Sequence, residues 1–425
     1  MSEKTTRFDR RRLLQKAARA GAALTVPWVI PGVVLGRDGA VAPSERVVLG
    51  GLGLGGRGTG DLNCFMNNPD VQFVAICDVR RQRREAIKSM ADSRYGNQDC
   101  MMYRDMHEIL ARQDIDAMLI ATGDRWHSMA SITAARAGKD VYCEKPCSMT
   151  ISESRALADT FRKYGCIYQA GTQRRSIGNF IFATELIADG KLGRLHTVHA
   201  NTRPPGTSHL WLPAEPEPPA DEVDWDRWLG PCPWRPYNSR YVGGGWRGFF
   251  DFHGGGILEW GAHTVDLCQW AAQKDETAPV EYVPNEGGAI CTYGDGLKLV
   301  MRSDGWMGLG TCSVRYEGDE GWIETGDSGK FAIHPESLRT QRTVFQQRGT
   351  DPTTHIRNFL DCVKTRRPAH ANSDVAARSH VVSHAAYIAW QLGRMLHFDP
   401  VREEFLADEE ANRMRSRAMR QPWRI

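Results

Sequence analysis

Short apolar runs alternate with stretches of helical composition in the first part of the chain. The runs of strand length are 46–52, 71–77, 117–121 and 141–143. Helices are predicted over 59–67 and up to Ala137, because apolar residues recur there at helical spacing. Alternation of strand and helix predicts a parallel sheet, and such sheets bind their ligands at the carboxyl ends of the strands.

A glycine-rich turn follows the first run. It fits the spacing G-x-G-x-x-G twice, as Gly51/Gly53/Gly56 and as Gly53/Gly55/Gly58. The second fit is preferred because it leaves the strand its full length. Glycines let the backbone approach a pyrophosphate, the next helix start supplies N–H donors, and Asp78 ends the following strand, where it can accept ribose hydroxyls. The predicted nucleotide-binding residues here are Gly53, Gly55, Gly56, Arg57, Gly58 and Asp78.

The choice between NAD and NADP depends on the residues around Asp78. Its carboxylate favours NAD, because it would repel a 2′-phosphate. Four arginines follow closely, and one of them could neutralise that phosphate, so NADP remains the alternative. At least two are better interpreted as a solvated helix face. The four are Arg80, Arg81, Arg83 and Arg84.

Two further strand ends carry polar residues. The run 117–121 leads into Thr122-Gly123-Asp124-Arg125-Trp126-His127, and the run 141–143 leads into Glu144-Lys145-Pro146. Because these ends meet at one edge of a parallel sheet, they are expected beside the glycine turn. The cofactor-binding candidates added here are Thr122, Asp124, Trp126, His127, Glu144 and Lys145.

The second half offers candidates for a substrate site. A capping box at Thr150 and Glu153 opens a helix to about Tyr164, and a strand at 167–170 delivers Gln173, Arg174 and Arg175. Gln173 is assigned to the cofactor. The two arginines suit a substrate anion or hydroxyls, although a salt-bridged structural role for at least one fits equally well.

An irregular, aromatic-rich region follows. Residues 204–236 hold nine of the 21 prolines and predict a long loop, and 211–270 holds seven of the 13 tryptophans. Indole faces pack against sugar C–H groups, so Trp246 and its neighbour Arg247 join the substrate candidates.

Composition narrows the function classes. The 425 residues are 41% hydrophobic and 25% charged, which is typical of a globular protein. The net charge of +3 arises at the N-terminus, so the near-neutral remainder gives no reason to propose nucleic acid as a partner. No apolar run is long enough to span a bilayer. The 11 cysteines are scattered singly, without metal-ligand spacing, and no metal site is predicted.

The N-terminus resembles a twin-arginine export signal. Arg10-Arg11-Arg12-Leu13-Leu14 precedes the apolar stretch 20–36, and Ala40-Val41-Ala42 offers a small-x-small cleavage pattern. Pro43 is a poor residue for signal peptidase. Residues 1–42 are therefore predicted to direct the protein to the periplasm, either cleaved or retained as a membrane anchor. An amphipathic N-terminal arm is the alternative.

Several runs in order resemble the glucose–fructose oxidoreductase / inositol dehydrogenase / rhizopine-catabolism (Gfo/Idh/MocA) family. They are the stretch from Gly53 to Glu144-Lys145-Pro146, the run 170–175, and Gly254-Gly255-Gly256 through Glu259 to His263. The resemblance implies an α/β protein with a Rossmann domain at 44–166. It implies a C-terminal substrate and oligomerisation domain at 167–425, with a large open, mostly antiparallel sheet. Tightly held NAD(H) or NADP(H), sugar or polyol substrates and homodimers or homotetramers are further implications.

Oxidation of a secondary alcohol needs a poised acid/base beside the reacting carbon. Lys145 could stabilise the alkoxide or relay its proton, and His263 is the second candidate. Glu259 lies one helical turn before His263 and is expected to orient it. In the family, the corresponding lysine, acid and histidine form the catalytic set. Here the acid is glutamate instead of aspartate, Thr264 replaces a common second histidine, and Gly123-Asp124-Arg125 replaces the usual Pro-Asp-His.

Three functions follow as hypotheses. The preferred one is an NAD(P)-dependent oxidoreductase that transfers hydride to or from a secondary alcohol of a sugar, polyol or derivative. The second is an enzyme of the same fold that cleaves glycosides by transient oxidation, elimination and re-reduction. The third is a sugar sensor that keeps its nucleotide for structure, against which the presence of both Lys145 and His263 argues.

Overall fold

Six parallel strands form the first sheet, in the order β3-β2-β1-β4-β5-β6. In the computed structural model, residues 41–339 and 348–425 are described. The predicted signal segment therefore lies outside them, apart from its last two residues. Residues 47–425 form one unit. The strands are β1 (Val47–Leu52), β2 (Val71–Cys77), β3 (Met101–Tyr103), β4 (Ala117–Ile120), β5 (Asp140–Cys143) and β6 (Tyr168–Ala170).

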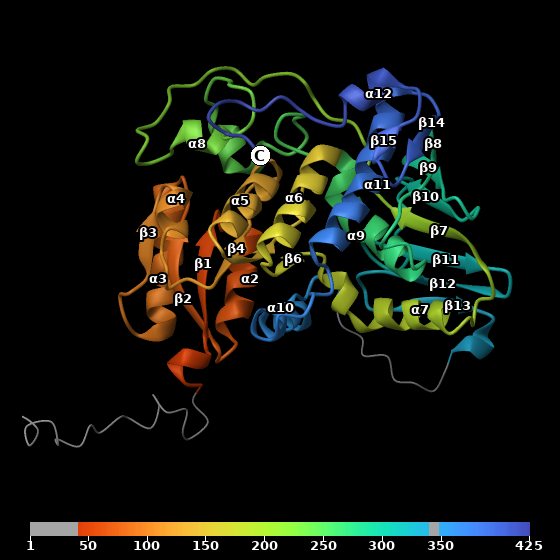
Figure 1. Ribbon diagram of the computed structural model, residues 1–425, viewed down its shortest axis with the longest axis horizontal. Helices are drawn as coiled ribbons and strands as arrows, with labels where there is room; N and C mark the ends of the chain where they lie inside the picture. Colours follow the sequence, from red (N-terminus) through yellow and green to blue (C-terminus); the bar gives the residue numbers. More distant parts are fainter. Residues whose placement is uncertain (1–40, 340–347) are drawn as a thin grey trace, which may run out of the picture. The chain divides into compact units, whose positions relative to one another are not determined.

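The strand order reverses between β1 and β4, which is the doubly wound arrangement predicted from the sequence. Helices cover both faces of this sheet (Figure 1). They are α2 (Gly56–Met66), α3 (Arg81–Tyr95), α4 (Met106–Leu110), α5 (Asp124–Arg136) and α6 (Ile151–Tyr164). Thr150 caps α6 as predicted, since its hydroxyl accepts a hydrogen bond from the backbone N–H of Glu153. The second half of the predicted capping box differs, because the Glu153 carboxylate accepts from the backbone N–H of Met149 instead.

Two boundaries differ from the sequence prediction. Helix α2 begins at Gly56, not at Thr59, because extended Gly55 serves as its N-cap. The domain boundary after residue 166 falls inside the first sheet, because β6 pairs in parallel with β5 through Val141 and Tyr168. The apolar run 167–170 completes the Rossmann sheet before the chain enters the second half.

Nine strands form the second sheet, in the order β13-β12-β11-β7-β10-β9-β8-β14-β15. Only β7 and β10 pair in parallel among the described strands of this sheet, which confirms the predicted, mostly antiparallel arrangement. The strands are β7 (Leu195–Asn201), β8 (Glu281–Asn285), β9 (Gly288–Thr292), β10 (Lys298–Arg302), β11 (Val314–Gly318), β12 (Gly321–Thr325), β13 (Phe331–His334), β14 (Leu396–Asp399) and β15 (Glu404–Phe405).

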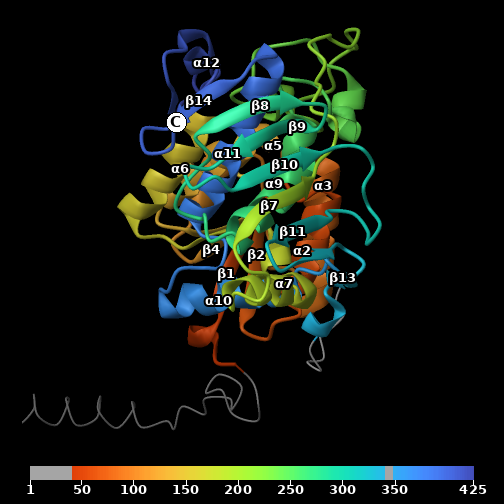
Figure 2. The same cartoon turned by 90° about the vertical axis from the view of Figure 1, so that its right-hand side faces the viewer.

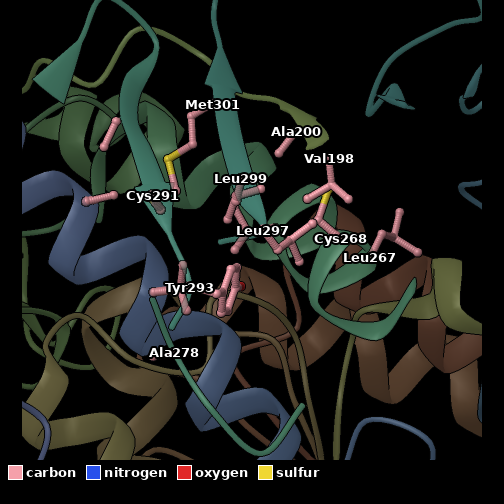
Figure 3. Packing of buried hydrophobic residues seen from close by; sticks show 14 of the residues in the cluster. Val198, Ala200, Leu267, Cys268, Ala278, Cys291, Tyr293, Leu297, Leu299 and Met301 are labelled. Atoms are coloured by element: carbon pink, nitrogen blue, oxygen red, sulfur yellow. The ribbon is translucent and has the colours of Figure 1, made fainter. Parts of the chain in front are cut away.

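Helices α9 (Gly255–Ala271) and α11 (Ser373–Leu392) cover one face of this sheet, behind the strands in Figure 2. The hydrophobic core of this half lies between these two helices and the sheet. Figure 3 shows part of it, where Val198 of β7 and Leu299 of β10 meet Cys268 of α9. Burial of these side chains fixes α9 against the sheet. The other helices of this half are α7 (Gly178–Ala188), α10 (Thr353–Thr365) and α12 (Glu409–Arg413), with the short helical turns η3 (Gln173–Ser176) and η5 (Glu336–Leu338).

The helix α10 returns to the Rossmann half. Its Phe359 ring lies 6.0 Å from that of Phe65 in α2 and 5.8 Å from that of Tyr142 in β5, both edge-on. Edge-to-face pairs of this kind add to the burial term. The two halves therefore share a core, and a single sequence boundary does not separate them.

The segment 204–236 is irregular, as predicted, apart from the short helix α8 (Trp225–Leu229). It continues through a wide turn η4 (Tyr241–Gly245). Trp225 stacks on Trp228 with ring centroids 4.7 Å apart, and both are buried. This small aromatic core gives the segment a fixed position although it has little regular structure. The C-terminal tail packs on it, since the Arg420 guanidinium donates to the carbonyl oxygens of Gly230 and Asp226.

Candidate active site

A cavity of about 570 Å³ opens where the carboxyl ends of β1, β2, β4 and β5 meet α9. Its walls include the glycine turn, Asp78 and the two strand-end runs that begin at Thr122 and Glu144. The opposite wall comes from the second half, through Glu259 and His263 of α9 and the segment 242–247. The cavity lies at the switch point of the sheet, where this architecture binds its ligands.

The three glycines of the preferred fit have three different roles. Gly53 has φ +64°, and a side chain there would meet Thr122 at 2.3 Å. Gly58 lets α2 approach β4, since a Cβ would lie 2.6 Å from the Cβ of Ala121. At Gly55 a Cβ would meet nothing within 4 Å, so this position borders open space. A tight turn, an open approach and close helix packing are what dinucleotide binding asks of these glycines.

Asp78 lines the cavity at the end of β2 and is 7% exposed. Burial raises the pKa of its carboxyl group. The hydrogen bond that this group accepts from the backbone N–H of Arg80 acts in the opposite direction but is the smaller effect. Arg80 and Arg83 also line the cavity. Arg81 and Arg84 instead bond Asp221. The structure thus separates the four arginines into two at the cavity and two structural ones.

A cluster of charged side chains adjoins the glycine turn, with Asp61 and Glu144 buried and Arg57 exposed. Arg57 bonds Glu144 at 3.1 Å and Asp61 at 3.1 Å. Burial, together with the nearby charge of Glu144, raises the pKa of Asp61 to about 8. Burial also opposes ionisation of Glu144, but Arg57 and Lys145 lower its pKa overall. Glu144 therefore carries the negative charge of this cluster.

The run after β4 is tied to neighbouring elements. The Asp124 carboxylate accepts a hydrogen bond from the backbone N–H of Gly254, 3.1 Å away, and so fixes the start of α9. His127 contacts the carbonyl oxygen of Pro146 through Nδ1 at 2.7 Å, and its Nε2 is buried with no partner among the described residues. Both residues and Trp126 line the cavity.

The departure from the family pattern at Gly123 and Arg125 has a steric explanation. A Cβ at position 123 would lie 2.4 Å from Nη1 of Arg125. The Pro of the usual family pattern carries such a Cβ, so glycine here makes room for the guanidinium. That guanidinium lies 3.6 Å from the ring centre of Trp228, and burial lowers the pKa of Arg125 to about 10. Arg125 also lines the cavity, although the sequence analysis did not assign it to the site.

Lys145 and Glu259 meet across the cavity from the two halves of the chain. The Lys145 ammonium donates to the backbone carbonyl of Glu259 at 2.7 Å and lies 3.7 Å from its carboxylate. Arg247 lies 3.7 Å from the same carboxylate. Burial would raise the pKa of Glu259, but a hydrogen bond with His253 and the charges on Lys145 and Arg247 lower it well below its ordinary value.

His253 holds the Glu259 carboxylate, and the sequence analysis missed it. Its Nδ1 accepts backbone N–H groups from Gly248 and Gly255, so Nε2 carries the proton and donates to Glu259 at 2.9 Å. The expectation that Glu259 orients His263 is wrong, since the described hydrogen bonds of this carboxylate go to His253 and not to His263. A histidine in the glycine-rich run before α9 was the signal available in the sequence.

His263 lies in the cavity wall, on the side formed by α9. It is 5% exposed, and its Nδ1 is buried without a hydrogen-bond partner among the described residues. Burial and the positive charges of Arg174, Lys145 and Arg57 lower the pKa of His263 well below the ordinary histidine value. The imidazole is therefore neutral at pH 7 and can accept a proton.

The run 173–175 divides in the structure. Gln173 and Arg174 line the cavity, and Arg174 forms two bonds of 2.7 Å with Asp327. Arg175 does not line it; its guanidinium bonds Asp266 and Asp275. The assignment of Arg175 to the substrate is therefore corrected to the salt-bridged alternative. Trp246 lines the cavity as expected, with its ring 5.9 Å from that of His253.

Comparison with known proteins identifies the family. A family model described as an oxidoreductase family NAD-binding Rossmann fold matches residues 46–172. A second, described as the C-terminal alpha/beta domain of the same oxidoreductase family, matches residues 210–425, about half of the chain. The chain belongs to the Gfo/Idh/MocA oxidoreductase family.

Among Gfo/Idh/MocA relatives, the chain is 30% identical over 162 residues to a myo-inositol 2-dehydrogenase of Thermotoga maritima, in a match that covers 38% of this chain and 47% of that protein. It is 32% identical over 174 residues to a glycosyl hydrolase family 109 protein of Saccharopolyspora erythraea, covering 37% of each. The chain thus spans half or less of the length of these relatives.

Solved structures share the fold. The WlbA dehydrogenase of Bordetella pertussis, in complex with NADH and UDP-GlcNAcA, superposes with a TM-score of 0.62 at 16% identity, covering 84% of this chain and 98% of that one. An aldose-aldose oxidoreductase of Caulobacter crescentus gives 0.59 at 19% identity, covering 83% and 100%. These likenesses confirm the two-sheet architecture.

Three further observations concern the thiols, possible metal-binding clusters and long apolar helices. All 11 cysteines are free thiols. The described part of the chain holds no cluster of histidine, cysteine, aspartate or glutamate suited to a metal ion. In residues 41–339 and 348–425, no helix is both long and apolar enough to cross a membrane.

Proposed function

We propose that this protein is an NAD(P)-dependent oxidoreductase that acts on a secondary alcohol of a sugar, polyol or derivative. One observation carries the proposal: His263 and the Lys145 ammonium line the same cavity as the glycine turn, and the buried Nδ1 of His263 has no hydrogen-bond partner within the described ranges. The relatives named as inositol dehydrogenase support the substrate class.

The residues present fit a dinucleotide. The open approach at Gly55 and the start of α2 would receive the pyrophosphate, and Asp78 would accept the adenosine ribose hydroxyls. A bound nicotinamide cofactor would supply the two-electron step by exchanging hydride with a substrate carbon. We propose NAD as the cofactor, with NADP as the alternative because Arg80 and Arg83 adjoin Asp78.

Side chains of the cavity carry out proton transfer, stabilisation of the alkoxide and positioning of the substrate. His263 accepts the proton of the substrate hydroxyl, because its environment keeps the imidazole neutral. Lys145, held by the Glu259 carbonyl, places a positive charge where the alkoxide develops. His253 fixes the Glu259 carboxylate, which in turn lies beside Lys145 and Arg247. Trp246 offers an apolar face for the sugar ring.

The similarity to a glycosyl hydrolase family 109 protein favours one second candidate function, the cleavage of glycosides by transient oxidation, elimination and re-reduction. In that reaction, oxidation of a ring carbon acidifies the adjacent C–H bond, the glycosidic substituent leaves by elimination, water adds, and reduction of the ketone restores the cofactor. The first step needs the same lysine and histidine. The net change is hydrolysis without net oxidation.

One experiment separates these functions. The purified protein is analysed by mass spectrometry for a co-purified nucleotide and then incubated with free sugars, polyols and aryl glycosides. Net reduction of the nucleotide by a sugar or polyol supports the dehydrogenase. Release of the aryl group without net reduction supports glycoside cleavage. A retained nucleotide with neither reaction would support the non-enzymatic sensor instead.

We further propose that residues 1–42 direct export through the twin-arginine route and that the enzyme works in the periplasm as a homodimer or homotetramer. The twin arginines, the apolar stretch and the cleavage pattern in the sequence support the export step. Fractionation of cells that express the Arg10→Lys/Arg11→Lys/Arg12→Lys variant tests it, since the variant should stay in the cytoplasm. Light scattering of the purified protein tests the assembly.

A further inference from the structure

The C-terminal tail forms part of the cavity wall. Trp423 lines the cavity, and its ring centroid lies 4.8 Å from that of Trp126, nearly perpendicular at 78°. Figure 1 draws the C-terminus beside α5, which carries Trp126, and α8. The last residues of the chain therefore join the first sheet, α9 and the aromatic-rich segment in lining the cavity.

Trp423 is connected through Trp126 and Arg227 to the side of the cavity that holds Asp78. The indole N–H of Trp126 donates to the Arg227 carbonyl at 3.0 Å, and the Arg227 guanidinium bonds Asp105 at 2.8 Å. Asp105 follows β3, the strand next to β2, and lines the cavity together with Asp78. This chain of contacts connects Trp423 to the strand ends that receive the adenosine half of a dinucleotide.

The tail is held firmly enough to act as a wall. The Arg420 backbone N–H donates to Pro231 at 2.9 Å, and its guanidinium donates to the carbonyl oxygens of Gly230 and Asp226 at 3.2 and 2.8 Å. Further back, Arg417 donates to the Phe250 carbonyl at 2.7 Å and stacks on that ring. These bonds fix Trp423 relative to Trp126.

The Trp423 indole nitrogen is buried and has no hydrogen-bond partner among the described residues. A buried N–H without an acceptor is unfavourable, and such groups in native structures usually point to a missing partner. Adenosine offers several acceptor atoms and a flat aromatic ring. An indole next to it supplies both a donor and a packing surface.

We propose that Trp423 binds the adenosine half of the dinucleotide, through its ring and its indole N–H, and that the C-terminal tail is therefore a cofactor-binding element. This inference rests on the proposed function, because it assumes a dinucleotide in the cavity. It adds a residue from the far end of the chain to a site that the Rossmann half is otherwise expected to supply.

The test uses two probes that divide the cofactor. ADP-ribose carries the adenosine half, and nicotinamide mononucleotide carries the other half. Binding of each is titrated to the full-length protein after charcoal treatment removes bound nucleotide. We expect Trp423→Ala to raise the Kd for ADP-ribose about tenfold. Trp423→Phe, which keeps a ring but loses the donor, should raise it about threefold.

The matched control is Trp234→Ala, since Trp234 is 60% exposed and does not line the cavity. This control should bind ADP-ribose as the wild type does. Mononucleotide affinity should not change in any of the three variants, which also shows that they are folded.

Unchanged ADP-ribose affinity in both Trp423 variants would overturn the inference, as would an equal loss for both probes. If Trp423→Ala does not fold, the result for Trp423→Phe decides alone. Failure of the wild type to bind either probe would instead overturn the proposed function, so the two failures are distinguishable.

Discussion

The two ends of the cavity are built by different means. At the glycine turn, the surface is mainly backbone: Gly55 leaves an open approach, and the charged groups of Arg57, Glu144 and Asp61 bond one another next to it. At α9 the surface is made of side chains, and His263 has a buried nitrogen without a partner among the described residues. A backbone cradle binds a constant ligand, whereas unpartnered side chains suit proton transfer and a variable substrate.

The largest expected effect is at the side-chain end. Substitution of His263 by Ala should lower kcat/KM about 10²–10⁴-fold, because a general base is lost, while the Kd for the nucleotide changes little. Steady-state kinetics and nucleotide titration measure the two effects. The exposed His196, changed to Ala, is the matched control and should leave both values unchanged. Equal loss of catalysis and nucleotide binding would show that the two ends are not separate in function.

His253 should have an intermediate effect. Removal of its hydrogen bond to Glu259 in His253→Ala leaves the carboxylate beside Lys145 and Arg247 without its fixed orientation. We expect kcat to fall about 10–100-fold, as for other residues that orient a reacting group, with KM less affected. Partial recovery in His253→Gln would support positioning, since its amide N–H can still donate to Glu259. A fall of KM and kcat in parallel with loss of folded protein would argue for a structural role only.

The backbone end is tested by a pair of glycines near the start of α2. A Cβ added at Gly55 or at Gly60 would meet no atom within 4 Å, but only Gly55 lines the cavity. Gly55→Ala should weaken nucleotide binding about tenfold, because the added methyl group occupies the approach of the pyrophosphate. Gly60→Ala should leave affinity unchanged and add slightly to stability, since alanine is the better helix former. Equal affinities in the two variants would contradict the assignment.

A separate prediction, on stability and not on activity, concerns the response of the buried histidines to pH. Burial lowers the pKa of His380 to about 4 and that of His355 to about 3, against about 6.5 in the unfolded chain. The unfolded state then binds more protons below pH 6.5, so stability falls as pH decreases from about 6.5 toward 4. For His380 alone the loss approaches about 3 kcal/mol. Urea unfolding at several pH values measures it, and constant stability down to pH 4 would contradict the burial of these groups.

The sequence predicted the backbone end better than the side-chain end. Glycine spacing, strand length and the acid at Asp78 are local signals, and the fold and the preferred glycine fit agree with them. The partner of Glu259 was missed although His253 lies nearby in the sequence, because the hydrogen bond between them depends on how the run before α9 folds. The assignment of Arg175 to the substrate was wrong because its ion-pair partners, Asp266 and Asp275, lie far along the chain.

The boundary at 166 and the role of the tail show a second limit. β6 and α10 join the Rossmann half through pairing and packing between segments that are distant in the sequence. No local sequence pattern predicts such contacts. Trp423 reaches the cavity from the last residues of the chain, and no local sequence pattern predicts that position.

The most direct test of the account is the titration of His263 by nuclear magnetic resonance, with selectively labelled histidine and the His263→Ala variant for assignment. The account predicts a neutral imidazole throughout pH 6–8, because burial and the charges of Arg174 and Lys145 lower its pKa. It also predicts that saturating NADH shifts its ring signals, since glycine turn and histidine share one cavity. A His263 that titrates near pH 6.5 and does not respond to bound NADH would contradict it.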